Sequence, residues 1–212
     1  MPARAVVMEE FGGPEVLRAR DVPAPEPRPG YAEVATARAE DLVPVPEGVA
    51  LRDAVALVAD GRTALSLHRR AQVRRDEHVL VEAAAGGVGS LLVQLASAAG
   101  ARVIGAAGSD RKSRPVMDLG AAAFVDYSRP GWLDEVRAAT GGRGVDLVFD
   151  GVGGAVGTEA VRALRDGGRV SVYGMAGGTE AAHDPADLRA RSIEARATLG
   201  KTLLAVGSVR EG

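Results

Sequence analysis

A glycine-rich turn at residues 79–89, with the sequence VLVEAAAGGVG, carries the strongest chemical signal in the chain. Gly86 and Gly87 would let the backbone approach a pyrophosphate closely, and Gly89 would let the following helix pack against the preceding strand. The start of that helix adds free N–H groups and the positive end of the helix dipole. Since Ala84 stands at the first glycine position of the strict GxGxxG pattern, the motif alone leaves a purely structural turn open.

The residues after the second predicted strand bear on which dinucleotide such a turn would bind. NAD-binding turns place an acidic residue about 20 positions on, where it bonds the ribose hydroxyls. Here that count falls on Ser109, within GSDRK at 108–112, and no acid stands at the strand tip. Ser109 and Lys112, helped by Arg111, favour a 2′-phosphate and hence NADP, although Lys112 also fits a solvated surface position. Asp110 could reach the ribose, but as a helix N-cap it would be occupied with backbone N–H groups.

Two further small-residue turns are predicted at the same edge of the sheet, DGVGG at 150–154 and GMAGG at 174–178. Doubly wound sheets bind ligands at the carboxyl ends of their strands, where both turns lie. Each turn alone is more often a tight loop, but three together would let a flat dinucleotide lie across the sheet. S-adenosylmethionine is a minor alternative. Methyltransferases also use a glycine-rich turn, but they too usually place an acid at the end of the second strand, and that acid is missing here.

Strands and helices alternate regularly between residues 78 and 173. Strands are expected at 78–82, 102–106, 122–126, 145–149 and 169–173, and helices at 86–99, 110–119, 132–139 and 155–164. This alternation predicts an α/β fold, a doubly wound parallel sheet of the Rossmann type covered on both faces. We expect the fifth strand near the sheet edge, where an exposed strand with apolar Val170 and Val172 would need covering, which favours a dimer.

The first 75 residues are less regular. Extended elements are expected in the first half, namely a hairpin of 5–9 with 16–22, a proline-rich connector at 23–30 and a strand at 31–38. Two helices are expected at 51–58 and 63–72, with a break around Asp60-Gly61. After residue 177 the pattern weakens, apart from a last apolar run at 201–206.

The composition argues against several classes of function. With 212 residues, 46% hydrophobic and 25% charged, and a net charge of −2, the chain is typical of a globular protein without nucleic-acid or anionic-membrane partners. Cysteine is absent, which excludes disulfides, thiolate nucleophiles and Cys-ligated metals. The N-terminus, with Glu9 and Glu10, does not fit a secretory signal, and the uncharged run at 83–101 is too weakly apolar for a membrane span. We therefore expect a cytoplasmic protein.

Taken together, the motifs resemble the zinc-independent quinone oxidoreductase branch of the medium-chain dehydrogenase/reductases. The similar segments are 80–89, VQLA at 93–96, GSDRK at 108–112, LGA at 119–121, VDY at 125–127 and TGGRGVD at 140–146. In addition, AVVMEEFGGPEVL at 5–17 resembles the opening strand and turn of that family, and GKTLL at 200–204 resembles its close.

This resemblance implies NADPH-dependent hydride transfer to a quinone or an α,β-unsaturated carbonyl, usually by a homodimer. The residues that it assigns to the cofactor are Gly86, Gly87 and Val88 at the pyrophosphate, Ser109 and Lys112 at the 2′-phosphate, Tyr127 by the adenosine, Gly151, Val152, Gly174 and Met175 along the border, and Thr63 near the nicotinamide. The structural alternative for Tyr127 is a strand-end aromatic at the core rim, and for Thr63 a helix N-cap.

The departures from the family concern the substrate side. Gly30 leads directly to Tyr31, where the family has most of a GroES-like barrel, and a second stretch is missing near 192–197. Asp60 stands where the family has a small or apolar residue. We therefore divide the chain into 1–75, a remnant of the GroES-like β domain with hairpin, linker and helical segment, 76–178, the NADP-binding domain, and 179–212, a C-terminal segment returning to the N-terminal part.

No catalytic residue is assigned, because Tyr31, His68 and His183 are each more often structural or solvated. Two alternatives to an active reductase stay open. One is a shortened NADPH-binding relative without turnover, which would act as a sensor or partner subunit. The other is a longer enzyme with segments absent from this sequence.

Overall fold

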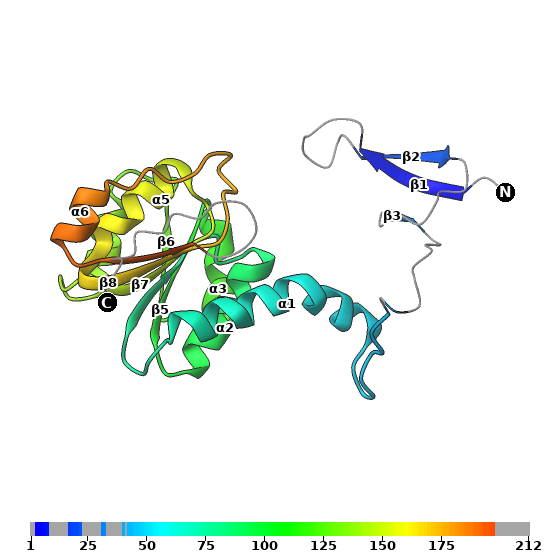
Figure 1. Ribbon diagram of the computed structural model, residues 1–212, viewed down its shortest axis with the longest axis horizontal. Coiled ribbons are helices and arrows are strands. Elements are labelled where there is room, and N and C mark those ends of the chain that lie inside the picture. The colour runs from blue at the N-terminus through cyan, green and yellow to red at the C-terminus, as the bar shows by residue number, and fades with distance from the viewer. Residues whose placement is uncertain (1–2, 9–16, 23–30, 33–39, 41, 198–212) are drawn as a thin grey trace, which may run out of the picture. The chain divides into compact units, whose positions relative to one another are not determined.

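The computed structural model describes residues 3–8, 17–22, 31–32, 40 and 42–197 (Figure 1). The chain separates into two compact units, residues 1–51 and 52–212. The expected functional boundaries after residues 75 and 178 stay predictions. The connector at 23–30, most of the strand expected at 31–38, and the apolar run at 201–206 lie outside the described residues.

The first unit contains a small antiparallel sheet with the order β2-β1-β3. Strand β1 (Ala3–Met8) pairs with β2 (Leu17–Val22) so that Ala3 lies opposite Val22, which confirms the expected hairpin. The short strand β3 (Tyr31–Ala32) pairs with the other edge of β1.

Helix α1 (Leu51–Ala71) is continuous, so the expected break around Asp60-Gly61 is wrong. A single glycine costs a helix only about 1 kcal/mol relative to alanine. Burial of Ala64, Leu67 and Ala71 along one face of the helix offsets that cost. Thr63 therefore lies inside a helix, and the alternative that it caps one is also wrong.

The second unit contains a six-stranded sheet in which every neighbouring pair is parallel. Its strands are β4 (His78–Val81), β5 (Arg102–Ala107), β6 (Ala123–Asp126), β7 (Val145–Asp150), β8 (Leu164–Val172) and β9 (Glu194–Ala197). Their spatial order is β6-β5-β4-β7-β8-β9. The chain thus moves outward from β4 in one direction and then, after β6, returns to continue from β4 in the other. This is the doubly wound order, with its switch point between β4 and β7, and it confirms the predicted fold class.

Four of the helices between the strands fall largely where the alternation predicts them, whereas α6 was not predicted. They are α2 (Gly87–Ala98), α3 (Ser113–Asp118), α4 (Trp132–Ala139), α5 (Gly154–Ala160) and α6 (Pro185–Ala190), with 3-10 turns η3 (Asp110–Lys112) and η4 (Val161–Ala163). The helix expected at 155–164 ends early, because Leu164 already begins β8. Gly100 follows Ala99, the C-cap of α2, with φ +85°, the left-handed conformation typical of the residue after a helix C-cap.

Two hydrophobic clusters cover the two faces of the sheet. Leu147 and Phe149 of β7 pack with Leu67 of α1 and Leu92 of α2, whereas Val148 packs in the other cluster with residues of α4, η4 and α6. Alternate residues of a strand point to opposite faces, which explains this division. Figure 1 shows α1, α2 and α3 on one side of the sheet and α5 and α6 on the other.

Strand β9 pairs with β8 along its outer side, placing Glu194 opposite Arg169. Residues 169–173 thus lie near the sheet edge, as expected, but β9 covers them, so the expectation that this strand is exposed at the edge is wrong. The sequence of β9, EARA, is only four residues long and its apolar positions are alanines, which are depleted in strands, so the sequence carries little strand signal. Homodimerisation, for which the exposed edge was one argument, stays a prediction.

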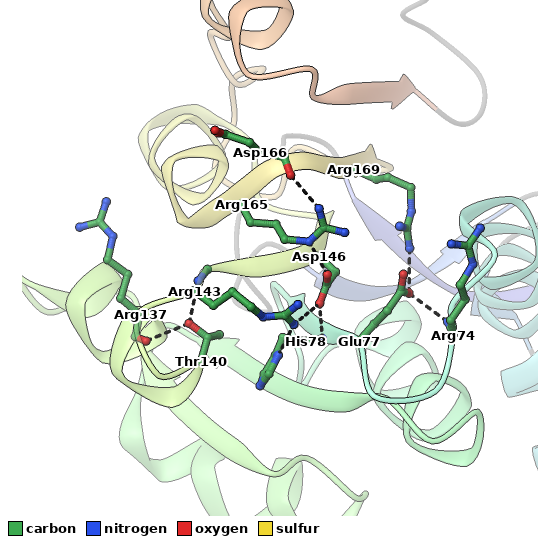
Figure 2. Close-up of polar contacts among 11 residues, drawn as sticks. Arg74, Glu77, His78, Arg137, Thr140, Arg143, Asp146, Arg165, Asp166 and Arg169 are labelled. Atoms are coloured by element: carbon green, nitrogen blue, oxygen red, sulfur yellow. Dashed lines mark hydrogen bonds and ion pairs between the residues drawn. The ribbon is translucent and has the colours of Figure 1, made fainter.

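The amino ends of the strands carry a network of charges, drawn in Figure 2. The buried Asp146 accepts hydrogen bonds from Arg165 (2.5 Å), Arg143 (2.8 Å) and the His78 amide (2.8 Å). Burial would raise the pKa of the Asp146 carboxyl, but these hydrogen bonds and the two arginine charges outweigh burial and lower it. Because β4, β7 and β8 are tied together here, we assign this network a structural role.

Candidate cofactor site

The carboxyl ends of strands β4 to β8 lie opposite the charge network, along one edge of the sheet. Since all of them are parallel, the three glycine-rich turns that follow β4, β7 and β8 lie at this same edge, as does the loop at 108–112 after β5. The sheet therefore gathers most of the predicted cofactor residues at the carboxyl ends of its strands, next to the switch point, where doubly wound folds bind ligands.

The first turn leads from β4 into α2. Gly86 is the N-cap, and its amide donates to the Ala83 carbonyl at 2.7 Å. A Cβ on Gly89 would collide with the Ala83 carbonyl, with the carbonyl carbon only 2.8 Å away, so α2 packs this close to the turn only with glycine there. Gly86 and Gly87 are exposed, and the first amides of a helix have no partners within it. This end of α2 can therefore receive an anion.

An acidic side chain lies against this turn. Asp60 projects from α1 so that a Cβ on Gly87 would fall on its Oδ2 atom, with Cγ 2.8 Å away. Thr63, expected near the nicotinamide, is half-buried and lies nearly one turn further along the same helix. The structure thus brings the Thr63 region of α1 to the glycine-rich turn, although nothing in the sequence pattern predicts the contact between Asp60 and Gly87.

The loop after β5 holds Ser109 and Lys112 in the short turn η3. The Ser109 hydroxyl accepts a hydrogen bond from the Arg111 amide at 3.3 Å, so Ser109, not Asp110, is the N-cap. A hydroxyl that accepts in this way can still donate its own hydrogen to a phosphate. Asp110 is instead paired with Arg129, which offsets its negative charge beside the loop. Lys112 is exposed.

Tyr127 lies beside this loop. Its ring is half-buried and meets Trp132 edge to face, with ring centroids 6.5 Å apart. A Cβ on Gly108 would lie 3.1 Å from Tyr127 Cε2, so the loop and the ring are in close contact. Tyr127 thus packs at the rim of the core, as expected if its role were structural. It also adjoins the loop that is expected to hold the adenosine end of the cofactor.

The second and third turns interlock. The Gly151 carbonyl accepts from the Ala176 amide at 3.2 Å, and the Val152 carbonyl accepts from the Gly177 amide at 2.8 Å. A Cβ on Gly174 would lie 2.7 Å from the Gly151 carbonyl oxygen, so only glycine allows this approach. Gly151 and Val152 are buried, whereas Met175 is exposed and available to a ligand. These four predicted residues are therefore close neighbours.

Two carboxyl groups missed by the sequence analysis lie below the turns. Glu82 follows β4, Asp150 ends β7, and both are fully buried. Asp150 Oδ1 accepts from the amides of Val152 (3.0 Å) and Gly153 (2.7 Å), and the Val152 amide also reaches Glu82 Oε2 at 3.3 Å. Burial, the Asp150 charge and a hydrogen bond with Asp150 raise the pKa of Glu82 well above its ordinary value. The available signal was a charged residue directly after the apolar run of β4.

The side chains considered as catalytic candidates are dispersed. His68 lies on α1, His183 lies in the loop before α6, and Tyr31 belongs to the other compact unit. Burial lowers the pKa of both histidines, opposed for His183 by the charge of Asp150. His183 lines a cavity of about 370 Å³ between α5, η4 and α6, which none of the predicted cofactor residues lines. The structure therefore assigns no catalytic role to them.

Among the described residues, no group of side chains fits a zinc ion. The chain has no cysteine and three histidines. Across the described ranges, no three His, Asp or Glu side chains are grouped so that they could hold a metal. Within the same ranges, no helix is both long and apolar enough to cross a bilayer.

Comparison with known proteins gives matches along most of the chain. Residues 87–205 match the family model described as zinc-binding dehydrogenase. Quinone oxidoreductase-like protein 2 of Bos taurus is 42% identical over 152 residues, 71% of this chain and 44% of that protein. A 2-haloacrylate reductase of a Burkholderia species is 35% identical over 155 residues, 72% of this chain and 46% of that protein. The chain thus spans about half the length of these relatives.

Solved structures share the architecture. Mycobacterial Rv1454c complexed with NADPH superposes with a TM-score of 0.75 at 27% identity, covering 92% of this chain and 81% of that one. Escherichia coli quinone oxidoreductase complexed with NADPH also gives a TM-score of 0.75, covering 93% of this chain and 81% of that one. Its identity of 20% supports the fold alone.

Proposed function

We propose that this chain binds NADPH and serves as an oxidoreductase. The chain belongs to the zinc-binding dehydrogenase family, and within that family it is similar to quinone oxidoreductases. The observation that carries the proposal is the meeting of three glycine-rich turns at the carboxyl edge of the sheet, beside the switch point. The NADPH in the structure of Rv1454c, whose fold this chain shares, supports the choice of cofactor.

Each group of residues has a proposed part in binding. The pyrophosphate would lie against Gly86, Gly87 and Val88. The amides of Gly87 and Val88 at the start of α2 would donate to it, because the Gly86 amide already donates to the Ala83 carbonyl. The Ser109 hydroxyl and the Lys112 ammonium would hold the 2′-phosphate, and the pairing of Asp110 with Arg129 would limit repulsion of that phosphate.

The remaining predicted residues would position the two ends of the cofactor. Tyr127 would lie by the adenosine, and Thr63 near the nicotinamide. The interlocked turns at 150–154 and 174–178, with Gly151, Val152, Gly174 and Met175, would border the cofactor between them.

Bound NADPH would supply a hydride, and the protein would supply orientation and exclusion of water. We propose a quinone or an α,β-unsaturated carbonyl as the acceptor. The names of the relatives support this class, since quinones and 2-haloacrylates both contain an electron-poor carbon–carbon double bond conjugated to a carbonyl group. Two-electron reduction of such a bond takes the hydride and one proton. We further propose that the reaction proceeds without zinc, which agrees with the lack of suitable ligands in the described ranges.

A fluorescence titration of the chain with NADPH and, in parallel, with NADH tests cofactor binding. We expect saturable binding with a preference for NADPH. Lys112→Ala should weaken NADPH binding roughly ten- to hundredfold and leave NADH binding unchanged, because a charge-assisted contact contributes about 1.5–3 kcal/mol. Arg114→Ala is the matched control, since Arg114 is an exposed cation on α3 that is paired with Asp118. Failure to bind either cofactor would contradict the proposal.

Turnover is tested separately by following NADPH oxidation with a simple quinone as acceptor. Saturable oxidation that depends on the protein is the expected result. Binding without oxidation would favour the second candidate, an NADPH-binding relative without turnover. That candidate is supported by the direct passage from Gly30 to Tyr31, where the family has most of a substrate-enclosing barrel.

A further inference from the structure

Asp60 is the side chain nearest to the exposed face of Gly87 at the start of α2. The three closest atoms that a Cβ on Gly87 would meet all belong to this residue, its Oδ2, Cγ and Cβ. The contact joins two helices that are far apart in the sequence. Its position matters because Gly87 provides the first amide of α2, which would donate to the pyrophosphate.

The charge of Asp60 suits the free helix end. The N-terminus of a helix carries a partial positive charge, which an acidic residue in the first turn often offsets. Helix α2 has no acidic residue in its own first turn, and the Gly86 N-cap has no side chain to cap it. The carboxylate of Asp60 therefore supplies from α1 the negative charge that α2 lacks.

We propose that the Asp60 carboxylate acts as an internal anion at the start of α2 and competes there with the pyrophosphate of the cofactor. This inference rests on the proposed function, since it concerns the same site. A pyrophosphate that reaches the Gly87 amide meets like charge unless Asp60 moves away. Asp60 thus sets the affinity for the cofactor, and the same charge stabilises the site when it is empty.

The pyrophosphate is common to NADPH and NADH, which provides a sharp test. Asp60→Asn keeps the size of the side chain and removes its charge. We expect this variant to bind both cofactors more tightly by the same factor, on the order of tenfold at low ionic strength. The gain should shrink in high salt, because salt screens the repulsion between exposed charges.

Thermal unfolding gives a readout independent of fluorescence and of activity. Without cofactor, Asp60→Asn should unfold about 1–4 °C below the wild type, because α2 loses a favourable charge at its start. With NADPH added, the midpoint of the variant should rise further than that of the wild type. Asp118→Asn is the matched control, since it removes an equal charge from an exposed ion pair at the end of α3.

Each outcome decides the inference. Tighter binding of both cofactors by Asp60→Asn than by the wild type supports it. Unchanged or weaker binding by the variant, with normal binding by the wild type, overturns the inference and leaves the proposed function intact. Absence of binding in both proteins overturns the proposed function, and the inference with it.

Discussion

At the scale of single residues, the buried carboxyl groups of Glu82 and Asp150 are the least expected feature of the site. Glu82 Oε1 and Asp150 Oδ2 have no hydrogen-bond partner within the described part of the chain. The raised pKa of Glu82 favours a proton on this carboxyl, which would give the pair a hydrogen-bond donor and avoid two adjacent negative charges. The two carboxyl groups anchor the turn at 150–154 through the amides of Val152 and Gly153, and we expect the pair to carry one negative charge rather than two.

The raised pKa of Glu82 predicts how stability depends on pH. The folded protein binds this proton more tightly than the unfolded chain does, so stability falls as the pH rises from the ordinary Glu range through the raised pKa. Glu82→Gln keeps a hydrogen-bond donor toward Asp150 and cannot ionise. We therefore expect this variant to be more stable than the wild type at alkaline pH, with a flatter dependence on pH, as measured by urea unfolding.

Glu135→Gln is the control for this measurement, because Glu135 is exposed on α4. It should follow the pH dependence of the wild type. A lower stability of Glu82→Gln at every pH would contradict the assignment of a proton to Glu82.

At the scale of elements, α1 places Asp60 against the glycine-rich turn and carries Thr63 on the same helix. Its second half packs through Ala64, Leu67 and Ala71 against β4, β7 and α2, whereas Leu51, Val55 and Val58 of its first half are exposed. Asp60 lies between these halves. A break at Asp60-Gly61 would free that carboxylate from its position, so the continuity of the helix matters for the site.

Substitution of Gly61 tests this continuity. Gly61→Ala should stabilise the protein by about 0.5–1 kcal/mol, because alanine is the better helix former. Its Cβ would lie 3.0 Å from Leu57 Cδ2, and Leu57 is exposed enough to shift. Gly61→Pro should destabilise by about 3 kcal/mol or more, because it removes a helical hydrogen bond. Tolerance of proline in chemical unfolding would indicate a break in the helix.

At the scale of the whole molecule, we propose a homodimer, as the resemblance to the quinone oxidoreductases implies. Size-exclusion chromatography with light scattering should give a mass twice that of the 212-residue chain at micromolar concentration. The argument from an exposed β8 no longer contributes, because β9 covers that strand. A monomeric mass would contradict the homodimer and leave cofactor binding unaffected.

The sequence determined the features that depend on local pattern and spacing. The alternation of apolar strands and amphipathic helices specified a doubly wound sheet, and glycines at fixed offsets specified tight turns at the carboxyl ends of its strands. Helix α4 begins at Trp132 and ends at Ala139, as predicted. The residues that specify its start and end lie within the helix itself or in the glycines that flank it. The family resemblance depended on the same local motifs.

Only the tertiary structure decided which distant residues meet. The pairing of β9 with β8, the burial of Glu82 beside Asp150, and the contact of Asp60 with Gly87 each join segments separated by 20 or more residues. Such contacts arise from the packing of the whole sheet and its helices, and a local pattern carries no record of them. The continuity of α1 has the same origin, because burial against the sheet outweighs the weak helix preference of Gly61.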